Sequence, residues 1–296
     1  MCAVSLGTDT NGSVRVPASF CGVWGLRPTY GRLSRAGVFP FAGSLDTVGV
    51  LGRGVADLAR TFDAMSGPDA RDPVCSSAAS RPVEPDLEQG PGGLRLGLLG
   101  GYFETGASQE AAAAVEAVAG AFARVERLEL PYPQLARSAA YVITAAEGGE
   151  LHRERLAGRA HDYDPSARDR FIAGALTPAA WYLHAQRFRA WWKAQLAEVF
   201  ARFDVLIAPA TPIVAPGLEQ QTFDFNGQQV PVRANVGLFT QPITLIGLPV
   251  VAAPVHAPGR LPIAVQLIGR PGGESQLLRA ARALEHAGVC AAPVVD

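Results

Sequence analysis

Lysine is almost absent from this chain. Of the 26 lysine and arginine side chains in 296 residues, one is a lysine, Lys193, and the others are arginines. Arginine stays protonated in proteins and cannot serve as a general base. A mechanism that needs a lysine base therefore has a single candidate here. Lys193 adjoins Trp191 and Trp192 on an expected amphipathic helix, a position typical of a solvated surface lysine.

Other signals are also missing. The sequence has no stretch of 18 uncharged apolar residues and no basic start followed by an apolar segment, so neither a membrane span nor a secretory signal is expected. The four cysteines show neither C-x-x-C spacing nor a disulfide framework, which favours reduced thiols and a cytoplasmic location. The five histidines fall in no ligand spacing, so we expect no metal and no cofactor. A net charge of −1 predicts no attraction to nucleic acid or to an anionic membrane.

What the sequence does contain is a concentration of small, polar and turn-forming residues near its start. Residues 3–6 are predicted to end a buried strand, and residues 7–12 form a loop that precedes Ser13. A short helix is expected over residues 14–23, with Pro17 tolerated in its first turn. Small residues let backbone N–H groups point at a ligand, and many hydrolases present a nucleophilic serine beside such groups. The alternative is a glycine-rich turn with a helix-capping serine.

Longer motifs resemble the amidase signature family. Residues 7–19, GTDTNGSVRVPAS, are similar to the family pattern G-T-D-T-G-G-S-[IV]-R-[IV]-P-A-S. Further similar runs are CGVWGLRPTYGR at 21–32, SLDTVG at 44–49 and LPIAVQLIG at 261–269. These motifs occur in the order that the family shows. The resemblance therefore covers nearly the whole chain, from residue 3 to about residue 288.

The resemblance implies a mechanism and a set of site residues. In this family a Ser–cis-Ser–Lys triad cleaves amides, and the lysine acts as base through the bridging serine. The motif places the nucleophile at Ser13 and the backbone N–H groups of the oxyanion hole at Asp9, Thr10, Asn11 and Gly12. Such donors are each worth about 3–4 kcal/mol in the transition state. Asn11 replaces the commoner glycine, so its side chain either narrows the pocket or hydrogen-bonds a polar substrate.

Three further residues are candidates for substrate contacts, namely Arg15, Tyr30 and Arg35. The alternative for Arg15, which lies two residues after Ser13, is a buried arginine that hydrogen-bonds the fold together. Asp46 is expected to organise a loop rather than to act as an acid.

The remaining patterns predict a single α/β domain over residues 1–296. A strand, a helix and a strand over 94–99, 109–122 and 125–130 indicate a parallel pair with a helical crossover. Asn226-Gly227 predicts a hairpin. Other helices are expected over residues 55–65, 134–156, 177–203 and 274–287. We expect the amidase-signature fold, a mixed central β-sheet with helices on both faces.

The lysine of the triad and the second serine are not among these motifs. In the family they lie in an N-terminal region, the serine within a G-S-S-G-G-S segment, and neither is present here. We therefore expect that the N-terminal portion is missing, as in a truncated gene model. The chain would then represent the C-terminal two-thirds of the family domain and would be inactive alone.

A group within the family is also indicated. Residues 63–69, DAMSGPD, and residues 237–243, GLFTQPI, resemble the 1-carboxybiuret hydrolase group. That group releases ammonia from small urea-like amides and pairs with a small helical partner subunit. The resemblance implies hydrolysis of a urea-like or carboxylated amide through a serine acyl-enzyme, in a homo- or hetero-oligomer. Two alternatives stay open: a glutaminase like the glutamyl-tRNA(Gln) amidotransferase component that supplies ammonia to misacylated tRNA, and a catalytically inactive fragment.

Overall fold

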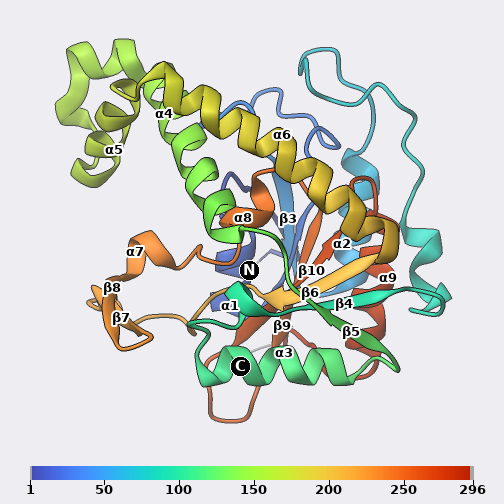
Figure 1. Cartoon of the computed structure of the whole chain (residues 1–296). Helices are drawn as coiled ribbons and strands as arrows, with labels where there is room; N and C mark the ends of the chain where they lie inside the picture. The colour runs from blue at the N-terminus through green and yellow to red at the C-terminus, as the bar shows by residue number, and fades with distance from the viewer. Residues whose placement is uncertain (1, 294–296) are drawn as a thin grey trace.

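The computed structural model describes residues 2–293, and its centre is a mixed eight-stranded β-sheet (Figure 1). Neighbouring strands are antiparallel from β1 as far as β6, and parallel from β6 through β4 to β5. The mixed sheet and the parallel pair are thus confirmed, with α3 (Gln109–Gly120) as the crossover. In spatial order the strands are β1 (Val4–Thr8), β3 (Val48–Gly52), β2 (Trp24–Arg27), β9 (Val250–Val255), β10 (Ile263–Gly269), β6 (Val205–Pro209), β4 (Leu96–Leu99) and β5 (Val125–Leu128).

Both faces of the sheet are covered by helices, as predicted. Successive side chains of a strand point to opposite faces. In β10, Val265 and Leu267 pack in a core with residues of α2, α3 and α9, whereas Ala264 and Ile268 belong to cores on the other face. The first face carries α2 (Val55–Met65), α3 and α9 (Glu274–His286), and the second carries α1 (Arg15–Cys21), α4 (Pro133–Arg159), α6 (Ala179–Arg202) and α8 (Gln241–Thr244).

Helix α5 (Pro165–Ala175) was not predicted. It folds back against α4 at the end that lies far from the sheet (Figure 1). The missed signal is Asp164, whose carboxylate accepts N–H bonds from Ser166 and Ala167 and caps the helix. Gly174 of α5 lies so close to α4 that a Cβ there would overlap the backbone of Ala145. Glycine at this position therefore allows the two helices to touch.

Two details of the predicted elements were wrong. Residues 3–6 were expected in a buried strand, but β1 is an edge strand of the described sheet and pairs with β3 alone, which leaves Leu6 56% exposed. Helix α6 was expected to begin at residue 177, but it begins at Ala179. Pro178 is the N-cap, and no side chain caps the helix.

The other segments are short. Asn226 and Gly227 both have positive φ and form the predicted hairpin turn.

Among residues 2–293, no helix combines the length and the apolar character that a bilayer crossing requires. The remaining elements are η1 (Glu84–Gln89), η2 (Gly101–Phe103), η3 (Ala160–Asp162), β7 (Thr222–Phe225), β8 (Gln228–Pro231) and α7 (Val232–Asn235).

Candidate functional site

The candidate site is built on the loop between β1 and α1, residues 9–13, which we call the Ser13 loop. Ser13 is exposed, and its hydroxyl makes no hydrogen bond to any residue that the structure describes. The Asp9 carboxylate shapes the loop, because it accepts N–H bonds from Gly12 at 2.8 Å and from Val14 at 3.3 Å. Gly12 has φ +130°, and a Cβ there would overlap Thr240. The turn that presents Ser13 therefore requires glycine.

A buried charge cluster lies beneath this loop. Asp9 pairs with Arg15 at 2.9 Å and with Arg27 at 3.3 Å, and all three side chains are fully buried. Burial by itself would raise the pKa of Asp9, but the charge and hydrogen bonds of Arg15, together with the charge of Arg27, outweigh it and lower the pKa to about 2. Burial lowers the pKa of Arg27 to about 10. Asp9 is therefore ionised whenever the fold is intact near neutral pH.

This shift predicts how stability depends on acid. Because the pKa of Asp9 falls from 3.8 to about 2 on folding, the unfolded chain binds its proton first as the pH drops. The Asp9 contribution, about 2 kcal/mol, should be complete above about pH 5 and should be lost as the pH falls toward 2. Urea unfolding of parent and Asp9→Asn across this range should show a stability gap that narrows with acid. A gap that stays constant would contradict the prediction, and the exposed Asp169→Asn is the control.

The Arg15 side chain is hydrogen-bonded within the protein. Its guanidinium donates to the Thr240 carbonyl at 3.1 Å, to Gln266 Oε1 at 2.8 Å and to Thr244 Oγ1 at 2.6 Å, besides Asp9. Arg15 has no exposed surface and its donors are engaged within the protein, which favours the alternative of a buried arginine that hydrogen-bonds the fold together. A contact between Arg15 and substrate stays an untested prediction. Arg15 ties the Ser13 loop to α8 and to β10.

The backbone N–H groups of the loop are not equivalent. Asp9 donates its N–H to the Thr47 carbonyl at 2.8 Å, and Gly12 donates its N–H to the Asp9 side chain. Those of Thr10, Asn11 and Ser13 have no acceptor among residues 2–293. Unpaired backbone donors beside an exposed hydroxyl can stabilise a developing oxyanion. Of the four N–H groups that the motif suggests, those of Asp9 and Gly12 are engaged within the protein and those of Thr10 and Asn11 are not. The N–H of Ser13 is a further unpaired donor that the motif did not suggest.

A second loop, residues 40–47, supports the first. Its Asp46 carboxylate accepts N–H bonds from Phe41 at 2.7 Å and Ala42 at 2.9 Å through one oxygen. The other oxygen accepts the Thr10 hydroxyl at 2.6 Å. Asp46 therefore joins the two loops, in agreement with its expected role as a loop organiser.

Tyr30 and Arg35 lie under the 40–47 loop. The Tyr30 hydroxyl donates to the Gly43 carbonyl at 2.7 Å, and Arg35 donates to the same oxygen at 2.5 Å. Arg35 also pairs with Asp72, and its hydrogen bonds lower the pKa of Asp72 to about 2. Neither residue hydrogen-bonds Ser13, and a direct role for them with substrate stays a prediction.

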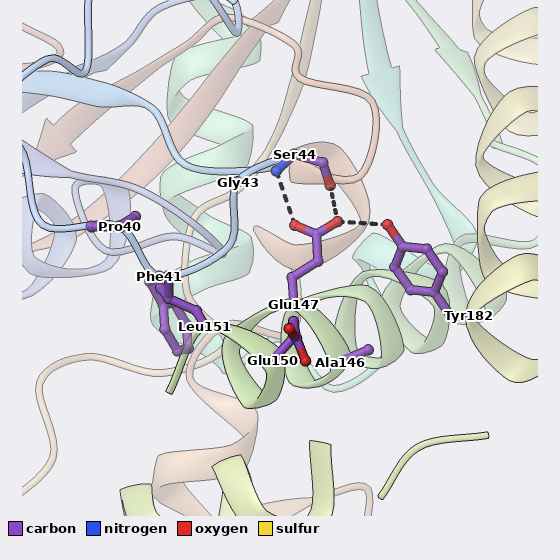
Figure 2. Close-up of a pocket in the computed structure, with 9 residues that line it drawn as sticks. All are labelled: Pro40, Phe41, Gly43, Ser44, Ala146, Glu147, Glu150, Leu151 and Tyr182. Atoms are coloured by element: carbon purple, nitrogen blue, oxygen red, sulfur yellow. Dashed lines mark hydrogen bonds between the residues drawn. The ribbon is translucent and has the colours of Figure 1, made fainter. Parts of the chain in front are cut away.

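A cavity of about 600 Å³ opens between the 40–47 loop and α4 (Figure 2). Apolar side chains such as Phe41 and Leu151 form much of its wall, and the hydrogen-bonded Glu147 and Tyr182 provide polar groups. Asn11 reaches the same helix, because its Nδ2 donates to Thr144 Oγ1 at 2.8 Å, three residues before Glu147. The cavity therefore begins within about one helical turn of the Ser13 loop. The motifs did not point to Glu147 or Tyr182, since both lie in helices that carry no motif.

Other candidate groups lie elsewhere. Lys193 is exposed on α6, as expected for a surface lysine. Among residues 2–293, no cluster of three or more histidine, cysteine or acidic side chains is arranged to hold a metal ion.

The sheet, its two helical layers and the Ser13 loop have the arrangement of the amidase family. The family model described as amidase matches residues 1–278, so the chain belongs to this family. It is 50% identical to AtzE, a 1-carboxybiuret hydrolase component of Pseudomonas sp. (strain ADP), over 97% of this chain and 63% of that protein. It is 37% identical to a component of the glutamyl-tRNA(Gln) amidotransferase of Anaeromyxobacter sp. (strain K), over 95% of this chain and 62% of that protein.

Solved structures of related proteins have the same fold as this chain. One of them, described as a vestigial protein complex that reveals the evolutionary origins of an s-triazine catabolic enzyme, superimposes with a TM-score of 0.96 and 48% identity. The match covers 98% of this chain and 64% of the chain in that structure. The corresponding component of the glutamyl-tRNA(Gln) amidotransferase of Thermotoga maritima gives a TM-score of 0.79 at 30% identity, over 96% and 62%. The chain thus spans a little under two-thirds of the length of the relatives that it matches.

Proposed function

We propose that this chain is part of an amidohydrolase that cleaves a small urea-like or carboxylated amide and releases ammonia. The observation that carries the proposal is the exposed Ser13 beside the unpaired N–H groups of Thr10 and Asn11. The 50% identity to a 1-carboxybiuret hydrolase component supports the substrate class. In this proposal residues 1–296 form one amidase domain.

The proposed chemistry follows from these groups. Ser13 Oγ attacks the amide carbonyl, the C–N bond breaks, and the amine leaves with a proton while an acyl-enzyme forms. The N–H groups of Thr10, Asn11 and Ser13 hold the oxyanion of the tetrahedral intermediate. Water then attacks the ester and restores Ser13.

The proton of Ser13 needs an acceptor. Among residues 2–293, no histidine, lysine or carboxylate hydrogen-bonds the Ser13 hydroxyl. The described residues therefore supply a nucleophile and oxyanion donors but no base. We place the base outside this set, in line with the family triad.

An unpaired arginine favours a substrate that carries a carboxylate. The Arg170 guanidinium lies 5.4 Å from the Phe41 ring and 5.2 Å from the Tyr141 ring. Burial lowers the pKa of Arg170, its Nε is enclosed without an acceptor, and no carboxylate pairs with it in residues 2–293. Phe41 lines the cavity, and Tyr141 precedes Thr144 by one turn of α4. A half-buried cation that has aromatic neighbours but no anionic partner favours an anionic ligand.

Substrate comparison tests the proposal. In the complete gene product, ammonia release should be faster from 1-carboxybiuret than from uncharged biuret or from glutamine. Arg170→Met should raise KM for the carboxylated amide about 10- to 100-fold, because a charged hydrogen bond is worth about 1.5–3 kcal/mol. The same variant should leave KM for biuret within twofold of the parent value. Arg168→Met on the same helix, where Asp169 already pairs the charge, is the matched control. Faster release from glutamine would favour the amidotransferase alternative.

Assembly is also part of the proposal. The structure that superimposes at a TM-score of 0.96 is described as a protein complex. We therefore propose that the complete protein works as an oligomer, and the expected form includes a small helical partner subunit.

A further inference from the structure

Glu147 of α4 is hydrogen-bonded to the 40–47 loop through one residue of that loop, Ser44. Its Oε2 accepts the Ser44 N–H at 2.9 Å and its Oε1 accepts the Ser44 hydroxyl at 2.7 Å (Figure 2). Oε1 also accepts the Tyr182 hydroxyl of α6 at 2.9 Å. All three partners are donors, an arrangement that suits an ionised carboxylate.

The third polar group of Ser44 is held as well. Arg189 of α6 donates to the Ser44 carbonyl at 2.9 Å. Every hydrogen-bonding group of Ser44 is therefore fixed by α4 or α6. A loop residue held this completely has little freedom to move relative to those helices.

The same loop is joined on its other side to the Ser13 loop. Asp46, two residues after Ser44, accepts the Thr10 hydroxyl, and the Thr47 carbonyl accepts the Asp9 N–H. These contacts flank the Thr10 N–H, one of the unpaired donors beside Ser13. A continuous path of hydrogen bonds and chain thus runs from Glu147 through Ser44 and Asp46 to Thr10.

We infer that Glu147 is a positioning residue for the reaction: by fixing Ser44 it sets the place of Asp46, and through Asp46 the place of the Thr10 N–H. The inference rests on the proposed function of the Ser13 loop. Glu147 does not touch the reacting atoms in this assignment. Its removal should therefore weaken oxyanion stabilisation, which acts on kcat, more than substrate binding.

The test compares Glu147→Gln with Glu154→Gln in the complete gene product. Glu154 is an exposed carboxylate on the same helix with no hydrogen bond to either loop. Glutamine at 147 turns an NH₂ group toward at least one of the three donors. We expect kcat for the carboxylated amide to fall about 10-fold, because small displacements of catalytic groups lower the rate of the chemical step. KM should stay within twofold of the parent value. Tyr182→Phe, which removes one donor of three, should lower kcat about threefold.

A second measurement does not require activity. Hydrogen–deuterium exchange of the backbone should become faster in residues 40–47 and at Asp9 in Glu147→Gln, and should stay unchanged in Glu154→Gln. Ser44→Ala removes only the hydroxyl contact and provides a milder variant if Glu147→Gln does not fold; faster exchange at Asp9 is expected there too.

Three results would overturn the inference. One is a rise in KM with kcat unchanged, which would make Glu147 a substrate contact. Another is a change in melting temperature with kcat unaltered. The last is an equal effect of Glu154→Gln. Failure of the proposed function is separate, because it would appear as full activity in Ser13→Ala whatever Glu147 does.

Discussion

Replacement of Ser13 by alanine should lower kcat for amide hydrolysis at least 10⁴-fold in the complete gene product. Loss of a serine nucleophile removes the covalent route altogether, and measured losses in serine hydrolases reach about 10⁶-fold. The remaining N–H donors of Thr10 and Asn11 would still polarise a carbonyl, so a small residual rate is expected. Steady-state ammonia release from 1-carboxybiuret measures the effect.

The structure also predicts that this variant stays folded. Ser13 is exposed and its hydroxyl contacts no described residue, so the melting temperature should change by about 1 °C or less. Ser5→Ala, which removes an exposed hydroxyl in β1, is the control and should keep full activity. More than one tenth of the parent rate in Ser13→Ala would remove this serine from the mechanism.

Replacement of Arg15 by methionine should cost about 3–5 kcal/mol of unfolding free energy, the largest stability loss that we expect from a single substitution here. The change leaves the buried carboxylate of Asp9 with Arg27 as its one charged partner. It also leaves Gln266 Oε1 without its donor and removes one of the donors to the Thr240 carbonyl. Urea unfolding followed by circular dichroism measures the loss. Activity should fall in parallel, because Asp9 shapes the turn that presents Ser13.

An exposed ion pair provides the comparison. Arg60 contacts Glu84 at 2.6 Å, but their side chains are 63% and 42% exposed. Solvent and salt weaken such pairs, so Arg60→Met should cost less than about 1 kcal/mol. The double variant Asp9→Asn with Arg15→Met should lose less than the sum of the two single changes, because the two groups compensate each other. Similar losses for Arg15→Met and Arg60→Met would show that the buried cluster does not hold the loop.

Local sequence predicted much of this molecule. The order of strand, loop, serine and helix at the start is fixed by small residues and by Pro17, and these features are local. The crossover from β4 to β5 follows from an alanine-rich helix between two segments with strand patterns, residues 94–99 and 125–130. The family resemblance, confirmed by the match over residues 1–278, rests on the same local motifs.

What could not be predicted depends on contacts between distant segments. Arg15 was a candidate for substrate because its partners Thr240, Thr244 and Gln266 lie more than 200 positions away. The motif could not show that the Asp9 N–H is taken by Thr47, since that bond depends on sheet pairing. Glu147 lies in a helix without a motif, and only the folded chain brings it to Ser44.

The glycine contact between α4 and α5 has a consequence for how substrate preference can change. Gly174 lets α5 touch α4, and Arg170 lies one helical turn earlier on α5. A methyl group at Gly174 would force the helices apart and carry the guanidinium away from Phe41. In the proposed enzyme the preference for charged substrates therefore depends on the spacing of two backbones as well as on the residues of the pocket. Mutation far from the reacting atoms can alter that preference while Ser13 and its loop stay intact.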